Sequence, residues 1–136
     1  KEIRSLAVAG KVSPIATIVQ VRNFVDRKLR EFGSKKRIVM DGRDIGTTVF
    51  PDAELKIFMT ADPMVRAQRR AAEMPGASIG DVLKNLEERD YIDSHREVSP
   101  LTQAADAVVL DNSNMTMQDQ VEWLKALISE RFGINE

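Results

Sequence analysis

The chain has 136 residues, enough for about one domain, and 43% of them are hydrophobic, which excludes wholesale disorder. Its formal net charge of −1, from 20 Lys+Arg and 21 Asp+Glu, excludes a general nucleic-acid binder, because that function needs a basic excess. Cysteine is absent, so disulfides and thiolate metal sites are excluded. The sequence shows no signal peptide and no apolar run near the roughly 18 residues of a membrane span. We therefore expect a cytoplasmic protein that binds neither nucleic acid nor membranes.

The N-terminal quarter of the chain predicts helix. A first apolar pattern stops at Gly10, and Ser13-Pro14 predicts a new helix with Ser13 as N-cap and Pro14 at the first helical position. Apolar residues then recur at helical spacing over 15–29, which predicts a helix with one apolar face. Gly33 is expected to end this helix.

Three short apolar runs predict β-strands, and helical patterns lie between the second and third of them. This alternation is typical of an α/β domain with a parallel sheet. Each run ends at polar residues, and open parallel sheets bind ligands beyond the carboxyl ends of their strands. The predicted strands cover residues 37–40, 55–60 and 107–110, and the predicted helices cover 63–73, 79–97 and 116–133.

The first candidate site is Asp41-Gly42-Arg43-Asp44, directly after the first predicted strand. Asp41 could hold a magnesium ion through water, and the planar guanidinium of Arg43 suits phosphate. Asp44 could orient Arg43 or accept a hydrogen bond from a ligand. A plain polar turn, in which Arg43 and Asp44 pair with each other, explains the same residues.

Two arginine groups follow on predicted helices. Arg66, Arg69 and Arg70 have i, i+3, i+4 spacing and so share one helix face, where they would repel each other without an anion between them. A solvated face neutralised by nearby glutamates is the competing interpretation.

The second group is Arg89, Asp93 and Arg96, at i, i+4, i+7, on one face if the helix is continuous. An Asp between two Arg residues can present both to phosphate or sugar hydroxyls. Ordinary helix ion pairing produces the same pattern. Arg22 on the upstream helix is, taken alone, an ordinary surface arginine.

Together these arginines, gathered at the expected ligand end of the sheet in a chain of near-zero net charge, indicate a polyphosphate ligand. Phosphoryl transfer depends mainly on positioning and charge neutralisation rather than on a covalent nucleophile. The absence of cysteine and of a plausible Ser/His/Asp arrangement around the single histidine is consistent with such chemistry.

The segment IVMDGRDIGTTVFPDAELKIFMTA, followed by RAQRR and by ERDYIDSHREVSPLTQAADAVVLDNS, closely resembles the bacterial cytidylate kinases. The upstream KVSPIATIVQVR resembles a helix of the same family, and the D-G-R-D-x-G-T-x-V-F-P-x-A run is a specific signature. The resemblance implies the P-loop nucleoside-monophosphate kinase type of α/β fold, a parallel sheet flanked by helices. It also implies transfer of the ATP γ-phosphoryl group to CMP or dCMP with Mg²⁺, in an enzyme that is monomeric when intact.

By position, the resemblance gives roles to individual residues. Ser13 and Asp44 would read the base, Arg22 and Arg43 would clamp the acceptor's phosphate or base edge, and Asp93 with Arg96 would recognise its sugar. Arg89 would act on the transferred phosphoryl group, with Arg43 and Asp41 also in the catalytic set and Asp41 supporting magnesium. The lid residues for ATP would be Arg66, Arg69 and Arg70. In domain terms, residues 1–35 would end the acceptor-binding region and 36–136 would form the C-terminal part of the kinase core, with a lid at about 64–96.

Two features depart from the family pattern. Many relatives carry another arginine where this chain has Tyr91 and Ile92. The phosphate-binding loop G-x-x-x-x-G-K-[ST] is absent from the sequence, and the chain begins with Lys1 inside a helical pattern. We therefore expect a C-terminal part of such a kinase, without its first strand and phosphate loop, that folds incompletely and cannot catalyse phosphoryl transfer alone.

Two other functions remain compatible with the residues. One is a non-catalytic nucleotide- or phosphate-binding domain that kept the acceptor pocket. The other is a kinase for another pyrimidine monophosphate such as UMP. Whether the gene encodes an upstream phosphate loop distinguishes the binding domain from a kinase. Competition binding among CMP, dCMP and UMP distinguishes a UMP kinase from a (d)CMP kinase.

Overall fold

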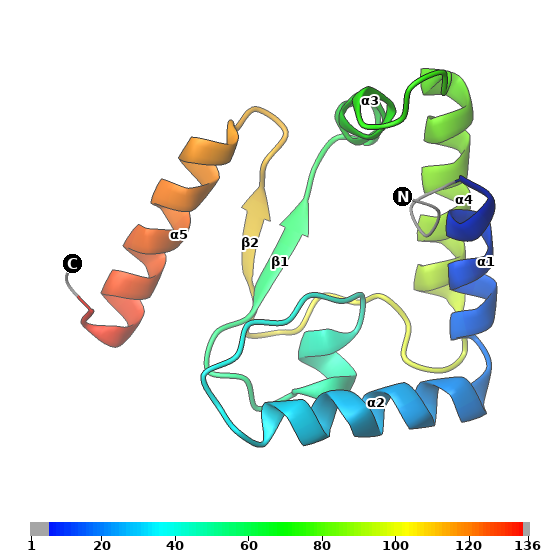
Figure 1. Cartoon of the computed structure of the whole chain (residues 1–136). Helices are drawn as coiled ribbons and strands as arrows, with labels where there is room; N and C mark the ends of the chain where they lie inside the picture. The colour runs from blue at the N-terminus through cyan, green and yellow to red at the C-terminus, as the bar shows by residue number, and fades with distance from the viewer. Residues whose placement is uncertain (1–5, 135–136) are drawn as a thin grey trace.

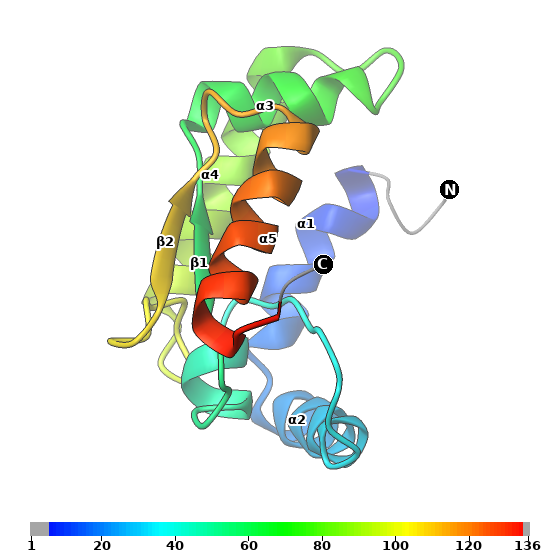
Figure 2. The ribbon, with the colours of Figure 1, turned by 90° about the vertical axis from the view of Figure 1, so that its left-hand side faces the viewer.

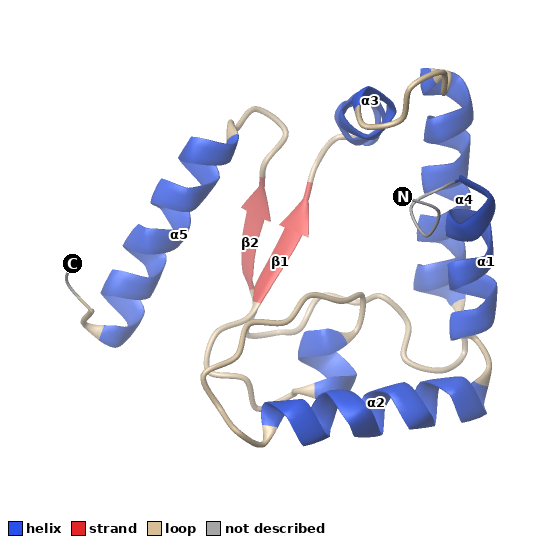
Figure 3. Ribbon diagram, in the orientation of Figure 1, coloured by secondary structure: helices blue, strands red, loops and turns tan. Residues whose placement is uncertain are grey.

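The computed structural model describes residues 6–134 and has the predicted α/β class, with a two-stranded parallel sheet among helices (Figure 1, Figure 3). In chain order its elements are α1 (Leu6–Ala16), α2 (Val19–Gly33), the π-helical turn η2 (Ile45–Val49), β1 (Ile57–Thr60), α3 (Pro63–Ala72), α4 (Ile79–His95), β2 (Val108–Asp111) and α5 (Met117–Phe132).

The second and third predicted strands are confirmed as β1 and β2, which run parallel with Ile57 opposite Val108 and Thr60 opposite Asp111. The backbone N–H of Asn112 extends this ladder by donating to the Thr60 carbonyl at 2.9 Å. The chain between the strands forms α3 and α4, as a crossover between parallel strands requires.

The first predicted strand, 37–40, is wrong for the described structure: these residues form a loop that carries no ladder hydrogen bonds. Lys36 and Arg37 have positive φ angles of 57° and 55°, so the chain turns before the apolar run. Val39 is fully exposed. A strand is stable only when a neighbour satisfies its backbone groups, and the described residues supply none beside this run.

The predicted helix start at Ser13 is also wrong. Both Ser13 and Pro14 lie inside α1, which continues past Gly10 and ends two residues after the proline. Proline lacks the N–H of the helical ladder and its ring crowds the preceding turn, so a helix seldom continues far beyond it. The Thr17 hydroxyl donates to the Pro14 carbonyl at 2.7 Å, and α2 starts afresh at Val19.

The helix pair α3 and α4 packs closely, and α1 lies along α4 (Figure 1, Figure 2). Ala67 of α3 and Val82 of α4 are 0% and 1% exposed. Asp62 caps α3 by accepting from the Met64 and Val65 N–H groups, and Ser78 caps α4. The helix α4 ends at His95, two residues before the predicted end, because the backbone of Arg96 is extended.

The helix α2 has an inverted burial pattern: its buried residues are Arg22 and Asp26. The apolar residues of the predicted face, among them Val21 and Val25, are exposed.

The helix α5 begins with the predicted Thr116–Asp119 capping box and ends at Gly133 in the left-handed region, but none of its residues is buried. Its predicted core stripe, which includes Val121 and Leu124, is exposed or half-buried because the two-stranded sheet is too narrow to cover it. Within residues 6–134, the helices are too short or too polar to cross a membrane.

Candidate functional site

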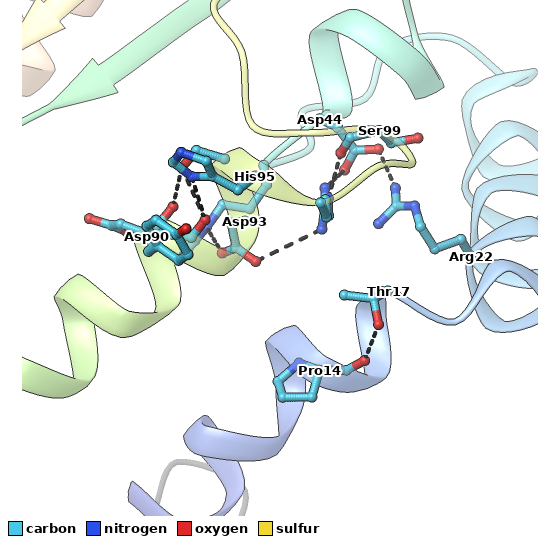
Figure 4. Close-up of polar contacts among 12 residues, drawn as sticks. Pro14, Thr17, Arg22, Asp44, Asp90, Asp93, His95 and Ser99 are labelled. Carbon is cyan, nitrogen blue, oxygen red and sulfur yellow. Dashed lines mark hydrogen bonds and ion pairs between the residues drawn. The ribbon is translucent and has the colours of Figure 1, made fainter.

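The centre of the candidate site is the buried carboxylate of Asp44, which is 7% exposed. Its backbone carbonyl accepts from N–H groups of η2, including that of Thr48 at 2.9 Å, and this bond holds Asp44 at the start of that turn. Its side chain accepts from two guanidiniums: Arg22 of α2 donates to Oδ2, and Arg96 donates from Nη2 to Oδ1 at 3.1 Å (Figure 4). Three segments that are distant in sequence therefore meet at one carboxylate.

Arg96 is placed by the end of α4, where the extended backbone directs its side chain toward Asp44. Its Nε donates to the Ser99 carbonyl, and its Nη1 lies 3.9 Å from Asp93 Oδ1. The side chains of Arg96 and Asp93 are each 3% exposed. The predicted pair is thus together, although Arg96 follows the helix instead of lying on its face.

Asp93 connects this centre to Arg43. The Arg43 Nε donates to Asp93 Oδ2 at 3.0 Å, and the Asp93 carbonyl accepts from the Leu101 N–H at 2.7 Å. The Arg43 side chain remains 41% exposed. Arg43 pairs with Asp93 and not with its neighbour Asp44, so the plain-turn interpretation, in which Arg43 and Asp44 neutralise each other, does not describe this contact.

Asp26 belongs to the same network, although it was not among the residues predicted for the site. It is 8% exposed, and its Oδ1 lies 3.5 Å from Nη2 of Arg22 one helical turn earlier. The i, i+4 spacing of Arg22 and Asp26 was the available signal. The network then runs through six groups of alternating charge: Asp26, Arg22, Asp44, Arg96, Asp93 and Arg43.

Arg89 adds a fourth guanidinium beside three carboxylates. Burial lowers the pKa of Arg89, and the nearby positive charge of Arg43 lowers it further, while Asp93 and Asp90 partly offset both effects. The Nε atoms of Arg89 and Arg22 are buried and have no hydrogen-bond partner in the part of the chain that the structure describes. Buried donors normally have partners, so these two positions and the local excess of positive charge favour an anionic ligand.

The three arginines expected on the lid do not meet. Arg66 binds Asp90 of α4 in a bidentate pair, with Nη1–Oδ2 and Nη2–Oδ1 distances of 2.6 and 3.1 Å, and this hydrogen bonding raises the pKa of Arg66. Arg70 pairs with Glu73 at 3.2 Å. Arg69 instead points to the loop after β2, where it donates to the Asn112 side chain and backbone, both at 2.8 Å. The expected common face of Arg66, Arg69 and Arg70 is therefore divided among three partners.

The two remaining predicted residues lie at opposite extremes of exposure. Ser13 is 1% exposed within α1, whereas Asp41 is exposed on the loop before η2. Residues 6–134 contain no group of three His, Cys, Asp or Glu side chains suited to a metal ion. Mg²⁺ is commonly held by one or two carboxylates, and the exposed Asp41 side chain offers one such oxygen ligand.

Comparison with known proteins gives a consistent result. The family model described as cytidylate kinase matches residues 1–130. A cytidylate kinase of Parabacteroides distasonis is 59% identical over 91% of this chain and 56% of its own length. Those of Bacteroides thetaiotaomicron and Porphyromonas gingivalis are 54% and 56% identical, over 97% and 98% of this chain and 58% and 60% of their own lengths. The chain thus spans somewhat more than half the length of these curated relatives.

Proposed function

The chain belongs to the cytidylate kinase family, which has the P-loop nucleoside-monophosphate kinase fold, and on that premise we propose that it is the acceptor-binding and lid part of a (d)CMP kinase. The reaction transfers the γ-phosphoryl group of ATP to CMP or dCMP. The bond between the γ-phosphorus and its bridging oxygen breaks as a phosphate oxygen of the acceptor bonds to that phosphorus, giving ADP and CDP or dCDP.

One observation carries the proposal. Five residues that the family resemblance assigns to the acceptor nucleotide form one continuous network of ion pairs, although they come from separate segments of the chain. These residues are Arg22, Arg43, Asp44, Asp93 and Arg96. Ordinary surface pairing would leave such groups exposed and scattered, whereas four of these five are buried.

Base selection is assigned to Asp44, with Ser13 as a second polar group. Each carboxylate oxygen of Asp44 accepts one guanidinium donor and keeps lone-pair capacity for another donor. The exocyclic amine of cytosine can donate there. Uracil would place a carbonyl oxygen against the carboxylate, so the spare lone pairs of Asp44 would gain no donor and like partial charges would come together.

Sugar and phosphate recognition is assigned to Asp93 and the arginines around it. The Asp93 carboxylate lies between Arg43 and Arg96, where it can accept from a sugar hydroxyl while it holds both guanidiniums in place. Arg43 keeps an exposed face for phosphate, and Arg22 keeps a buried Nε donor. Guanidiniums bind phosphate oxygens in planar, bidentate geometry, which suits a monophosphate acceptor.

Charge stabilisation during transfer is assigned to Arg89, whose Nε has no hydrogen-bond partner within residues 6–134. Arginines at this kind of position neutralise charge that develops on the phosphoryl oxygens. Arg66 and Arg70, on residues 64–96 taken as the lid, are assigned to ATP. Asp41 would support Mg²⁺, which when bound with ATP neutralises phosphate charge. Arg69 is not assigned to ATP, because it is bound to Asn112 outside residues 64–96, whereas the partners of Arg66 and Arg70, Asp90 and Glu73, lie within that segment.

The phosphate loop that cradles ATP is not found in these 136 residues. We propose that full activity requires it, and that the 136-residue chain alone is inactive. The test is a coupled ADP-release assay with CMP, dCMP and UMP, run on this chain and on the protein extended to its native start. Turnover in the extended form only, with CMP and dCMP preferred, supports the proposal. Turnover in the short form contradicts the missing-loop argument, preference for UMP contradicts the base assignment, and CMP binding without turnover in either form favours the binding-domain alternative.

A further inference from the structure

We infer that Asp26 is a positioning residue for the acceptor nucleotide, which holds the Arg22 guanidinium in place while Asp44 binds the base. Asp26 acts through Arg22 and does not itself touch the nucleotide. The inference rests on the proposed function, because it gives a role in acceptor binding to a residue that the family resemblance did not assign.

The first argument is the burial of a charged pair on α2. Arg22 and Asp26 are each 8% exposed, while apolar residues of the same helix such as Phe24 and Val25 are 55% and 43% exposed. Removing two charges from water carries a desolvation cost that their attraction does not reliably recover. The buried pair is therefore not explained by stability alone, and its burial indicates a further role.

The second argument is the sharing of one atom between two carboxylates. Nη2 of Arg22 donates to Asp44 Oδ2 and lies 3.5 Å from Asp26 Oδ1. Asp44 is also shared with Arg96 and is the group assigned to the base, so its bond to Arg22 is the one most affected when a nucleotide enters. Asp26 lies on the same helix as Arg22 and offers a charge partner that does not depend on that event.

The third argument is that the two carboxylates leave Arg22 incompletely satisfied. Its Nε is buried and without a partner in the described structure. The Arg22 guanidinium is held in place at Nη2, and its Nε donor is unused. Such a preorganised donor can bind a ligand without a further loss of rotamer entropy. Without the Asp26 charge, Asp44 is the remaining carboxylate partner of Arg22. The guanidinium would then move with Asp44 whenever that side chain shifts to bind a base.

The test uses the protein that contains this chain, expressed from its native start, and the variants Asp26→Asn and Glu31→Gln. Both changes remove one carboxylate charge from an ion pair on α2 with almost no change in size, but Glu31 pairs with Lys28 at the surface, where the two side chains are 53% and 46% exposed. Titration calorimetry measures the Kd of CMP and of ATP, steady-state kinetics separates KM from kcat, and thermal unfolding reports stability.

We expect Asp26→Asn to raise the Kd and the KM for CMP by roughly tenfold or more, because small misplacements of a positioning group are costly, and to leave the affinity for ATP within about twofold. Glu31→Gln should bind both nucleotides as the unmodified protein does. Loss of ATP and CMP binding in parallel, or a change confined to the unfolding temperature, would overturn the inference.

A double-mutant cycle tests whether Asp26 acts through Arg22. In an Arg22→Met background, Asp26→Asn should cost no further CMP affinity, because the group that it positions is already gone. Additive losses would overturn the inference. If Asp26→Asn does not fold, Asp26→Glu keeps the charge but displaces it by one methylene, and weaker CMP binding in a folded Asp26→Glu variant supports the positioning role. If that variant binds CMP normally, the carboxylate serves only the fold.

The two proposals fail in different ways. An unmodified protein that neither binds nor phosphorylates CMP overturns the proposed function and this inference with it. An unmodified protein that binds CMP, together with an Asp26→Asn variant that binds it equally well, overturns this inference alone.

Discussion

Asp44 and Arg96 are 52 residues apart in the chain, and their side chains are joined by a 3.1 Å hydrogen bond in a buried position. With Arg22 on its other oxygen, Asp44 balances two guanidiniums that have little access to water. The carboxylate therefore supports the fold as well as the proposed base selection, and the two contributions can be measured separately.

Replacing Asp44 by Asn should lower the free energy of unfolding by about 3 kcal/mol, because it leaves two buried cations without their shared counter-charge. Urea unfolding measures this loss. The control is Glu54→Gln, which breaks the exposed Lys36–Glu54 pair and should cost less than about 1 kcal/mol. Equal losses of unfolding free energy in the two variants would contradict the proposal that Asp44 stabilises the fold.

Replacing Arg89 by Met should affect catalysis strongly and stability little. Its pKa is lowered chiefly by burial, so the folded protein gains little from its charge, and removing it should leave the unfolding temperature unchanged or slightly raised. The kcat of the intact kinase should fall by roughly 10³-fold if Arg89 stabilises the transferred phosphoryl group. A variant that is strongly destabilised but has normal kcat would assign Arg89 to the fold instead.

Replacing Arg69 by Met should destabilise the protein by about 0.5–1.5 kcal/mol, because the exposed amide and carbonyl oxygens of Asn112, at the start of the loop after β2, exchange a guanidinium donor for water. The KM for ATP should change little, which distinguishes Arg69 from Arg66 and Arg70. Gln68→Ala, an exposed change on the same helix, is the control for α3 itself. A large rise in KM for ATP with unchanged stability would return Arg69 to the ATP-binding set.

The capping box of α5 predicts a pH dependence. Hydrogen bonds from the Thr116 N–H and hydroxyl to Asp119 hold the pKa of that carboxyl below its ordinary value of about 3.9. Because the folded-state pKa is the lower one, the stabilisation is present above the unfolded-state pKa and is lost as the pH falls through the folded-state pKa. Asp119→Asn should therefore be less stable than the unmodified protein at pH 7, and the difference should shrink toward pH 3, as measured by thermal unfolding. A difference that does not depend on pH would contradict this assignment.

Gly33 at the end of α2 has a packing role. A Cβ atom at this position would overlap the Phe50 ring, so Gly33→Ala should destabilise the protein by about 1–3 kcal/mol. Phe50→Leu, combined with Gly33→Ala, should recover part of that loss by vacating the space. If the double variant is no more stable than Gly33→Ala alone, the overlap is not the cause.

Local sequence signals determined much of this protein. The helices around 63–72 and 117–132, their caps at Asp62 and Thr116, and the two strands that pair were all predictable, because each depends on residues within a few positions of one another. The family was predictable too, because a dense run such as Asp-Gly-Arg-Asp is specific without any knowledge of contacts.

Other features depended on contacts between distant residues. Residues 37–40 have the composition of a strand, but a strand also needs a neighbour, and the described structure places none beside them. The same holds for the site. The spacing of Arg89, Asp93 and Arg96 predicted a shared helix face, but only the turn of the chain after His95 directs Arg96 to Asp44. The local sequence pattern determines which side chains a segment presents. Which opposite charge each buried side chain pairs with depends on the tertiary fold, because burial removes the charge from water and requires a partner close by.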